Sequence, residues 1–221
     1  MINTKDIFNI KTEAQFNALE LDVFNFQFEN NRVYRSFCDL LYKHPSYVKR
    51  IEDIPFLPIQ FFKSHNVVST QSEIVEVFES SGTTGSVNSK HHVTDLSIYE
   101  MSFTKGFNHF YGNIEDYTIL ALLPSYLERN NSSLVYMVND LIKKSNNPES
   151  GFYLDNLEAL KNTLIRLESK GQKTLLIGVS FALLDLIELH QFKLKNTIVM
   201  ETGGMKGKRK ELVKSELHDI L

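Results

Sequence analysis

The chain has 221 residues, a formal net charge of −3 at pH 7, 42% hydrophobic residues and 23% charged residues. This composition is typical of a globular protein long enough to bury one sizeable core, with room for a small second unit. The nearly balanced charge gives no general electrostatic attraction for nucleic acid or for an anionic membrane surface.

Three further features concern the compartment in which the protein works. Cys38 is the single cysteine, so no internal disulfide can form, as expected for a reducing compartment. The first six residues lack the apolar core of a signal peptide. No run of about 18 apolar residues is present, so no membrane span is expected. Together these features predict a cytoplasmic protein.

The N-terminal part of the sequence predicts helices followed by an extended stretch. Apolar residues recur at helical spacing between residues 12 and 44, and Pro45 interrupts the pattern. Residues 51–70 are expected to be extended, because proline disfavours helix in the residue that precedes it. Apolar and acidic residues then alternate over residues 74–79, which is the period of a half-buried strand.

The remainder of the sequence alternates between strands and helices. The helices expected here cover residues 95–111, 132–144, 155–170 and 181–190, and the strands cover 117–123, 174–179 and 197–201. The residues expected to cap these helices are Asp95, Ser132, Asp155 and Ser180. Such alternation predicts right-handed crossovers and a mainly parallel sheet with flanking helices. We therefore expect an α/β fold over residues 51–221, preceded by a helical lead-in over residues 1–50.

Residues 78–92 read FESSGTTGSVNSKHH and form the most informative stretch of the sequence. Residues 80–85 are all Ser, Thr or Gly, and the basic cluster Lys90-His91-His92 follows. Glycine lets backbone N–H groups turn toward an anion, hydroxyls add donors, and Lys90 supplies a compact positive charge. The pattern predicts a phosphate-binding loop after a strand, and an ordinary surface turn is the alternative interpretation.

Two common phosphate-binding motifs do not fit this loop. A Walker loop requires G-x-x-x-x-G-K-S/T, whereas only Thr83 and Thr84 separate Gly82 from Gly85, and Ser86 occupies the position of the lysine. A G-x-G-x-x-G dinucleotide fingerprint is also absent from the sequence. The loop therefore belongs to neither of these two classes.

The loop instead resembles the signature Y/F-x-S-S-G-T-T-G-x-P-K of adenylate-forming enzymes, a superfamily of acyl-CoA synthetases, luciferases and peptide-synthetase adenylation domains. Phe78 and residues 80–85 match the signature, whereas residues 86–89 stand between the last glycine and Lys90. The wider sequence resembles one branch of this superfamily, the LuxE-type acyl-protein synthetases. The segments that carry this resemblance are residues 54–58, 62–64, 78–85, 123–129 and 201–207.

The resemblance implies an enzyme that uses ATP and Mg²⁺ to activate a carboxylic acid, such as a fatty acid, as an acyl-adenylate. The acyl group then passes to a thiol, either a protein cysteine or coenzyme A. The residues implied to bind the nucleotide are Ser80, Ser81, Gly82, Thr83, Thr84, Gly85, Glu201, Thr202, Gly203 and Gly204. Within this set the loop is implied to hold the β- and γ-phosphates, with Lys90 as a supporting charge.

Three of the resembling segments follow predicted strands. The loop follows Phe78, Ser125 and Tyr126 follow the strand that ends at residue 123, and Gly203 and Gly204 follow the strand of residues 197–201. Because ligands bind beyond the carboxyl ends of strands in open α/β sheets, these segments predict a shared site. In that site Thr83, Thr84, Lys90 and His92 are the candidate catalytic residues. Ser125 and Tyr126 either border the acyl pocket or cap and pack a helix.

Other candidates have competing interpretations. Glu201 either contacts the nucleotide or caps a nearby helix, and the basic residues 206–210 are expected on a solvated helix face. His91 and His92 are adjacent on a predicted strand and point to opposite faces, so they are not expected to ligate one metal together, and no metal ligand is assigned. Cys38 lies in an apolar helical pattern and is expected to be a buried small hydrophobe.

The resemblance also implies motifs that do not occur between residue 204 and Leu221. These are a Y-G-x-T-E-like motif, an Asp for the ribose, a domain with a catalytic lysine, and an acyl-accepting cysteine. Residues 1–221 are therefore expected to be the incomplete N-terminal domain of an adenylate-forming enzyme, lacking the C-terminal domain, with weak or no catalysis alone. Two alternatives stay open, a non-catalytic nucleotide- or acyl-binding half-enzyme and an unrelated α/β transferase that acts on another phosphate ester.

Overall fold

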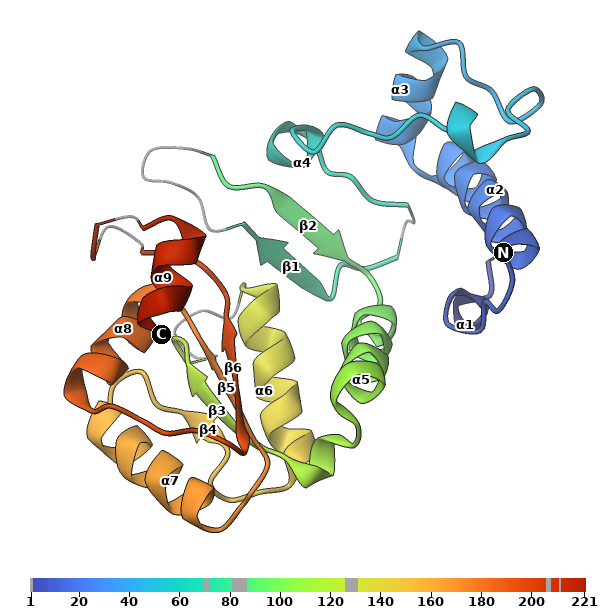
Figure 1. The fold of residues 1–221 in the computed structure, drawn as a ribbon. Coiled ribbons are helices and arrows are strands. Elements are labelled where there is room, and N and C mark those ends of the chain that lie inside the picture. Colours follow the sequence, from blue (N-terminus) through green and yellow to red (C-terminus); the bar gives the residue numbers. More distant parts are fainter. Residues whose placement is uncertain (1, 70–71, 81–86, 126–130, 206–207, 211) are drawn as a thin grey trace. The chain divides into compact units, whose positions relative to one another are not determined.

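The structure of the chain is a computed structural model that divides into two compact units, Met1–Ser102 and Phe103–Leu221. The residues that it describes are 2–69, 72–80, 87–125, 131–205, 208–210 and 212–221. The helices and strands of each unit are labelled in Figure 1.

The first unit begins with helices, as the apolar spacing predicted. Its helices are α1 (Thr4–Ile7), α2 (Glu13–Asn30), α3 (Arg32–Leu40), the 3₁₀ turn η1 (Ile51–Asp53) and α4 (Phe61–Ser64). The Thr12 hydroxyl accepts from the Gln15 N–H at 3.2 Å, and the Gln15 side chain reaches back to the Thr12 N–H, which starts α2 with a capping box. The Asn31 side chain accepts from the Tyr34 N–H at 3.1 Å, so α3 begins as a separate helix directly after α2.

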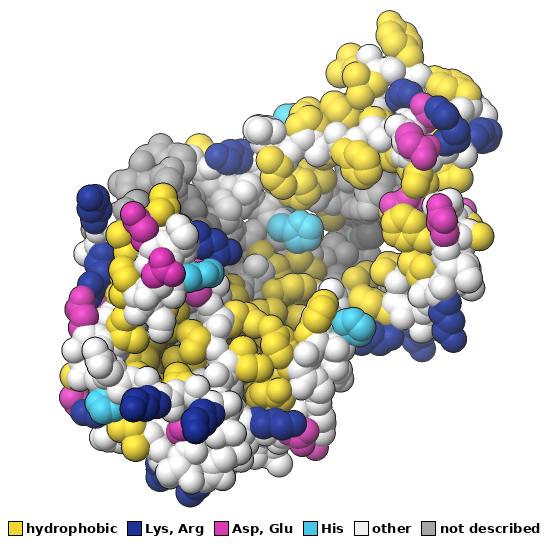
Figure 2. Space-filling model, viewed as in Figure 1, with side chains coloured by type: hydrophobic (Ala, Val, Ile, Leu, Met, Phe, Trp, Pro, Cys, Tyr) yellow, Lys and Arg dark blue, Asp and Glu magenta, His cyan; other side chains and the backbone are white. Residues whose placement is uncertain are grey.

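A small aromatic core holds the helices of the first unit together. Its buried members are Phe24, Phe28, Tyr34, Cys38 and Val48. Cys38 is 0% exposed, which confirms the prediction of a buried cysteine. The Tyr34 hydroxyl donates to the Pro55 carbonyl at 2.7 Å, so this core also anchors the extended stretch after η1. Apolar side chains also remain exposed in the same unit: Leu40, Tyr42, Tyr47, Phe56 and Ile59. Figure 2 shows hydrophobic side chains on the visible surface of the protein.

The first unit also contains an antiparallel hairpin made of β1 (Glu76–Glu79) and β2 (Lys90–Val93). The strand predicted over residues 74–79 is thereby confirmed. In the hairpin register Phe78 lies opposite His91, and Val77 lies opposite His92. Phe78 is buried, and its ring packs edge-on against Tyr99 with the centroids 5.5 Å apart. The hairpin thus brings both ends of the Ser/Thr/Gly loop to one place.

The second unit contains a four-stranded parallel sheet in the order β4-β3-β5-β6, which confirms the predicted α/β fold. The strands are β3 (Thr118–Leu122), β4 (Gly151–Phe152), β5 (Thr174–Gly178) and β6 (Thr197–Glu201). β3 and β5 are buried along their whole length, as expected of short apolar runs at the centre of a parallel sheet. β4 was not predicted, because a two-residue strand is too short to show a period.

Helices alternate with these strands along the chain, as predicted. Between the strands lie α6 (Ser133–Ser145), α7 (Leu157–Ser169) and α8 (Ser180–Leu189), whereas α5 (Ser97–Tyr111) and the 3₁₀ turn η2 (Ile114–Asp116) precede β3 and α9 (Lys214–Ile220) follows β6. Ser132 caps α6 as predicted, by accepting from the Val135 N–H at 3.4 Å. Two predicted caps were wrong. Asn156 rather than Asp155 caps α7, and α8 has no side-chain cap because Val179, which has no polar side chain, occupies the cap position and Ser180 already lies within the helix.

Helices pack on both faces of the parallel sheet (Figure 1). On one face Ile119 and Leu175 pack with Leu141 of α6 and Phe107 of α5. On the other face the buried cluster includes Leu120, Leu122 and Leu176 of the sheet together with residues of α7 and α8: Leu160, Leu164, Leu183 and Leu186. The central strands are therefore covered on both faces, whereas Ile198 and Val199 of the edge strand β6 stay exposed.

Candidate functional site

The candidate site of the second unit lies at the carboxyl edge of the sheet. β3, β5 and β6 are neighbours and run parallel, so the residues that follow them leave the sheet at the same edge. After β6 the chain forms a turn over Thr202, Gly203 and Gly204, which we call the glycine turn. Ligands of open α/β sheets bind at this edge, so the geometry agrees with the position predicted for a ligand site.

A hollow of about 430 Å³ opens beside the glycine turn, and we call it the carboxyl-end hollow. Its lining comes from the first residue of α8, the end of β6, the glycine turn and the segment that leads into α9. The lining residues are Ser180, Glu201, Thr202, Gly203, Gly204, Met205, Leu212, Lys214 and Leu217. All four predicted nucleotide-binding residues of this region, 201–204, therefore lie around one cavity.

Glu201 organises the floor of this hollow through one carboxylate oxygen. Its Oε1 atom accepts the hydroxyl of Ser180 and the backbone N–H of Gly203, the latter at 2.5 Å. Thr202 adds a second link between the strands, because its N–H and its hydroxyl both donate to the Gly178 carbonyl, at 3.0 and 3.1 Å. The ends of β5 and β6 are thus joined by side chains as well as by the sheet.

The two glycines of the turn have conformations that other residues rarely adopt. Gly203 has φ +81° and Gly204 has φ +94°. For residues with a Cβ atom this region is costly, so glycine is the residue that the turn requires. A backbone without side chains at these two positions can also approach a flat ligand closely, as the resemblance to adenylate-forming enzymes implied.

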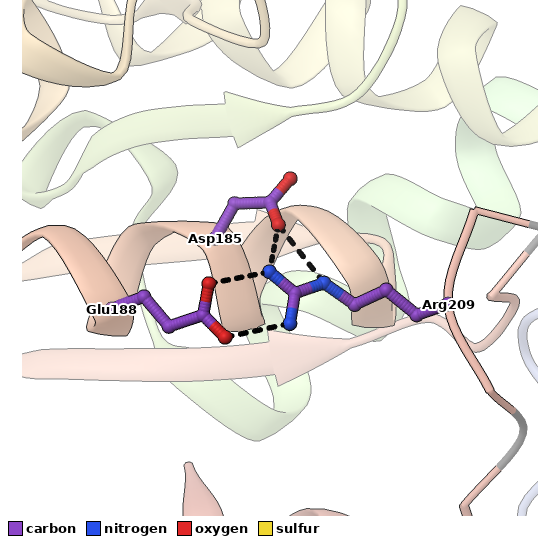
Figure 3. Close-up of polar contacts among 3 residues, drawn as sticks. All are labelled: Asp185, Glu188 and Arg209. Atoms are coloured by element: carbon purple, nitrogen blue, oxygen red, sulfur yellow. Dashed lines mark hydrogen bonds and ion pairs between the residues drawn. The ribbon is translucent and has the colours of Figure 1, made fainter.

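The segment after the glycine turn is held against α8. Met205 is buried at 2% exposure, and the Lys208 ammonium lies over the Phe181 ring, 4.8 Å from its centroid. Arg209 lies between two carboxylates of α8 (Figure 3). Its Nε donates to Asp185 at 3.0 Å, while Nη1 and Nη2 each donate to Glu188 at 2.7 Å. We call this arrangement the Arg209 clamp.

The Arg209 clamp corrects one prediction. Residues 206–210 were expected on a solvated helix face. Lys208 and Lys210 are exposed, but they precede α9, which begins only at Lys214, and Arg209 is ion-paired; Lys206 lies outside the described residues. The guanidinium lowers the pKa of the Glu188 carboxyl, first through its hydrogen bond and then through its charge. Because the partners are 21 and 24 residues away in sequence, the pattern of the basic run gave no sign of the clamp.

The predicted phosphate loop belongs to the first unit. Residues 81–86 lie outside the described residues, so the structure says nothing of Ser81, Gly82, Thr83, Thr84 and Gly85. Ser80 is described: its N–H donates to the Ser89 carbonyl and its hydroxyl accepts from the Ser89 N–H, each at 3.0 Å. These two bonds close the base of the loop.

The basic cluster on β2 is partly engaged within the hairpin. The Lys90 ammonium lies 3.6 Å from Glu79 on β1, and its side chain is 54% exposed. His91 stacks on Phe62 with the ring centroids 5.7 Å apart, and loss of hydration followed by the charge of His92 lowers its pKa. The Nδ1 atom of His92 is shielded from solvent and has no hydrogen-bond partner among the described residues. Within this cluster, Nδ1 of His92 is therefore a buried polar atom that lacks a hydrogen bond to the described residues.

The predicted substrate residues are described only in part. Ser125 lies just after β3 at the carboxyl edge and is half-buried, whereas Tyr126 lies outside the described residues. Two polar residues that line the carboxyl-end hollow, Ser180 and Lys214, were not predicted as site residues, nor were the apolar lining residues Met205, Leu212 and Leu217. Ser180 was taken for a helix cap, and Lys214 stands in a run of charged residues without a motif. For Ser180 the position directly after a parallel strand was the available signal.

The parts of the chain that the structure describes contain no group of three His, Cys, Asp or Glu side chains placed to hold a metal ion. Glu201 is the carboxylate of the hollow, and one of its oxygens already accepts two hydrogen bonds. Within the same parts of the chain, no helix is both long enough and apolar enough to cross a membrane. The metal finding concerns side chains of the protein alone, and a Mg²⁺ ion can also bind together with the phosphates of a nucleotide.

The parallel sheet with a ligand-sized hollow at its carboxyl edge defines an α/β enzyme domain. Among protein families, the model of "Acyl-protein synthetase, LuxE" matches residues 6–219. Because the match spans nearly all of the 221 residues, the chain belongs to the LuxE family of acyl-protein synthetases. Comparisons with curated proteins and with solved structures gave no significant match.

Proposed function

We propose that the protein uses ATP to activate a carboxylic acid, in the first place a fatty acid, and passes the acyl group to a thiol. The observation that carries this proposal is the LuxE family match over residues 6–219, together with the glycine turn that the structure places in a hollow at the carboxyl edge of the sheet. The family is one of acyl-protein synthetases, so both an acid and an acyl acceptor belong to the reaction.

The proposed reaction has two steps. A carboxylate oxygen attacks the α-phosphorus of ATP, the bond to the bridging oxygen breaks, and pyrophosphate leaves. The acyl-adenylate then reacts with a thiolate of a protein cysteine or of coenzyme A, which forms a thioester and releases AMP. Both steps need groups that stabilise the charge developing on phosphate oxygens.

We assign the nucleoside part of ATP to the carboxyl-end hollow. The acidic residue Glu201 lines that hollow, which makes it a poor place for the triphosphate, and the glycine turn offers a surface free of side chains for a flat base. The Gly203 N–H is already bonded to Glu201, so this turn does not present that donor to a phosphate. Lys214 is the cation at the rim of the same hollow.

We assign the phosphates to the predicted loop of residues 80–85, with Lys90 as the supporting cation. The Lys90 side chain is 54% exposed and its contact with Glu79 is 3.6 Å long. Exposed ion pairs of this kind contribute about 0–1 kcal/mol, so exchange of Glu79 for a phosphate is inexpensive. His92, whose Nδ1 has no partner among the described residues, is the second candidate to face the reacting groups.

The proposed use of Mg²⁺ requires no site made by the protein alone. Mg²⁺ usually keeps several waters and binds through one or two carboxylates together with the phosphates of a substrate. The described residues bring no three acidic, histidine or cysteine side chains together. We therefore assign no step of the reaction to a metal ion held by these residues.

The experiment that tests the proposal is acid-dependent exchange of labelled pyrophosphate into ATP, measured on the full gene product with a series of fatty acids. We expect exchange with at least one acid and none without acid. Replacing Thr83 and Thr84 by Val should reduce exchange by at least about tenfold, because two donors to the leaving group are lost. Thr104→Val, which removes the acceptor of a 2.9 Å bond from Lys144, is the matched control and should retain exchange.

Other results would favour one of the alternative functions or contradict the assignment of the loop. Binding of ATP without exchange, for every acid tried, contradicts the enzyme and favours a binding module. Turnover of a sugar phosphate without a nucleotide favours the unrelated transferase. Unchanged exchange in the Thr83 and Thr84 variant contradicts the assignment of the phosphates to the loop.

A further inference from the structure

The hydroxyl of Ser180 is used in an unexpected way. Ser180 is the first residue of α8, and the cap position before it is occupied by Val179, whose side chain makes no capping hydrogen bond. The Ser180 hydroxyl donates to Oε1 of Glu201, 21 residues later in the chain. Ser180 is 3% exposed, so this hydrogen bond forms away from bulk water. The Ser180 hydroxyl therefore links the start of α8, which follows β5, to the last residue of β6.

The same oxygen of Glu201 also fixes the glycine turn. Oε1 accepts from the Gly203 N–H at 2.5 Å, while Gly203 has φ +81°. Glycine adopts many conformations freely, so a turn that depends on it needs an external contact to be held in one of them. Oε1 supplies that contact, and Ser180 orients the carboxylate that carries it. The second oxygen, Oε2, accepts no hydrogen bond from the described residues.

We propose that Ser180 and Glu201 are positioning residues that hold the glycine turn in the shape that receives the nucleotide. The proposal rests on the function proposed above. It reassigns Ser180 from a helix cap to the site, and it gives Glu201 a task that does not require contact with the ligand. We call the contact of Ser180, Glu201 and Gly203 through one oxygen atom the Oε1 lock.

The Oε1 lock makes a specific kinetic prediction. A preformed turn improves nucleotide binding in the ground state and in the transition state alike, so its loss should raise the KM for ATP more than it lowers kcat. Loss of one such contact should raise this KM by about tenfold, the order expected for a hydrogen bond to a charged group. A residue that only stabilises the fold changes neither parameter at a temperature where the protein stays folded.

The experiment measures kcat, KM for ATP and the unfolding midpoint for Ser180→Ala, Glu201→Ala and the double variant. If both residues act through one oxygen, the double variant should be no worse than the worse single variant. Glu201→Gln keeps an acceptor oxygen and should restore most of the affinity. Ser145→Ala is the matched control, because Ser145 is also 3% exposed and donates to the Ile142 carbonyl at 2.8 Å. It should lower stability without changing the KM.

The outcomes separate this proposal from the proposed function. An unchanged KM in Ser180→Ala, with a loss of stability like that of Ser145→Ala, overturns the Oε1 lock and leaves the enzyme reaction standing. Independent effects that multiply in the double variant overturn it as well. If the wild type neither binds ATP nor exchanges pyrophosphate, both proposals fail together.

Discussion

The two ends of β6 are each held by a glutamate that accepts backbone N–H groups and a hydroxyl. At the amino end, Oε1 of Glu168 accepts from the N–H groups of Lys195 and Asn196 at 2.6 and 2.8 Å, and Oε2 accepts the Thr197 hydroxyl at 3.0 Å. At the carboxyl end, Glu201 accepts through Oε1 alone. Among the described residues, Glu168 therefore accepts hydrogen bonds through both carboxylate oxygens, whereas Glu201 accepts them through one.

The hollows beside the two ends of β6 also differ in volume and in backbone conformation. The amino-end hollow has about 260 Å³ and is lined by Ile165, Glu168, Ser169, His190, Phe192, Lys193 and Leu194. The carboxyl-end hollow has about 430 Å³ and contains the glycine turn with its two positive φ angles. A glutamate that accepts backbone N–H groups is thus common to both ends of β6. Of the two, the carboxyl end adds a carboxylate oxygen that accepts no hydrogen bond from the described residues, glycines without side chains and a place at the carboxyl edge, and the proposed site rests on these features.

The largest expected effect comes from adding a side chain to the glycine turn. Gly203→Ala places a Cβ at φ +81°, where the nearest atom is Oε1 of Glu201 at 4.0 Å, so backbone strain rather than a clash causes the effect. We expect the turn to change shape and the KM for ATP to rise by at least about tenfold, at a cost in stability of about 1 kcal/mol.

Gly171→Ala is the control for that change. Gly171 follows α7, has φ +67°, and a Cβ there would meet nothing within 4 Å. It should lose about 1 kcal/mol of stability by the same strain, with the KM for ATP unchanged. Equal KM values for the two alanine variants would contradict the role of the glycine turn.

The second prediction concerns the amino end of β6. Glu168→Ala leaves the N–H groups of Lys195 and Asn196 without their acceptor, which should cost about 1–2 kcal/mol because the site is half-exposed. Urea unfolding measures this loss. Pyrophosphate exchange at a temperature well below unfolding should be that of the wild type. A raised KM for ATP would mean that the amino end takes part in binding.

The third prediction concerns the Arg209 clamp beside the carboxyl-end hollow. Arg209→Gln removes the contacts with Asp185 and Glu188, so the segment before α9 should lose its fixed position. Because these groups are partly exposed, we expect only about a two- to fivefold rise in the KM for ATP. In the wild type, added salt should weaken the ion pairs of the clamp and so raise the KM for ATP. In Arg209→Gln, which lacks these ion pairs, added salt should not produce this rise. Equal salt dependence in the two proteins would rule out the clamp.

The smallest expected effect is a pH dependence at the amino end of β6. Desolvation acts to raise the pKa of Glu168, but the hydrogen bonds from Lys195, Asn196 and Thr197 outweigh it, so the pKa is lowered. A lowered pKa in the folded state means that the stabilisation is present above the ordinary Glu value of about 4.3 and is lost as pH falls further. Urea unfolding between pH 7 and 3 should therefore show a shallower acid loss in Glu168→Gln. Identical slopes would contradict this assignment.

The sequence predicted those parts of the fold that depend on local pattern. β3 and β5 were predicted because they are continuous apolar runs, and Ser132 was predicted as a cap because capping acts over three residues. Gly203 and Gly204 were assigned to a turn after a strand, and to the nucleotide only through the resemblance; the structure gives both positive φ angles. Two failures were local, namely the cap of α7, which was placed one residue too early, and the short strand β4. The others depend on pairs of residues distant in sequence, which no local pattern reveals.

Ser180 and Arg209 show what local sequence patterns could not predict. A serine at the start of a helix predicts a cap by local rules, yet a carboxylate 21 residues later binds its hydroxyl instead. The partners of Arg209 precede it by 21 and 24 residues, so its charge looked like part of a solvated face. The order of β4, β3, β5 and β6 in the sheet brings these groups together, and the coarse prediction did not specify that order.

The most direct test of the account is hydrogen exchange of the full gene product with and without ATP, read out on peptides from the two ends of β6. We predict that ATP slows exchange in peptides that cover residues 201–205 and leaves those of residues 190–197 unchanged. If saturating ATP slows exchange at residues 190–197, or slows it equally at both ends or at neither, the assignment of the nucleotide to the glycine turn is contradicted.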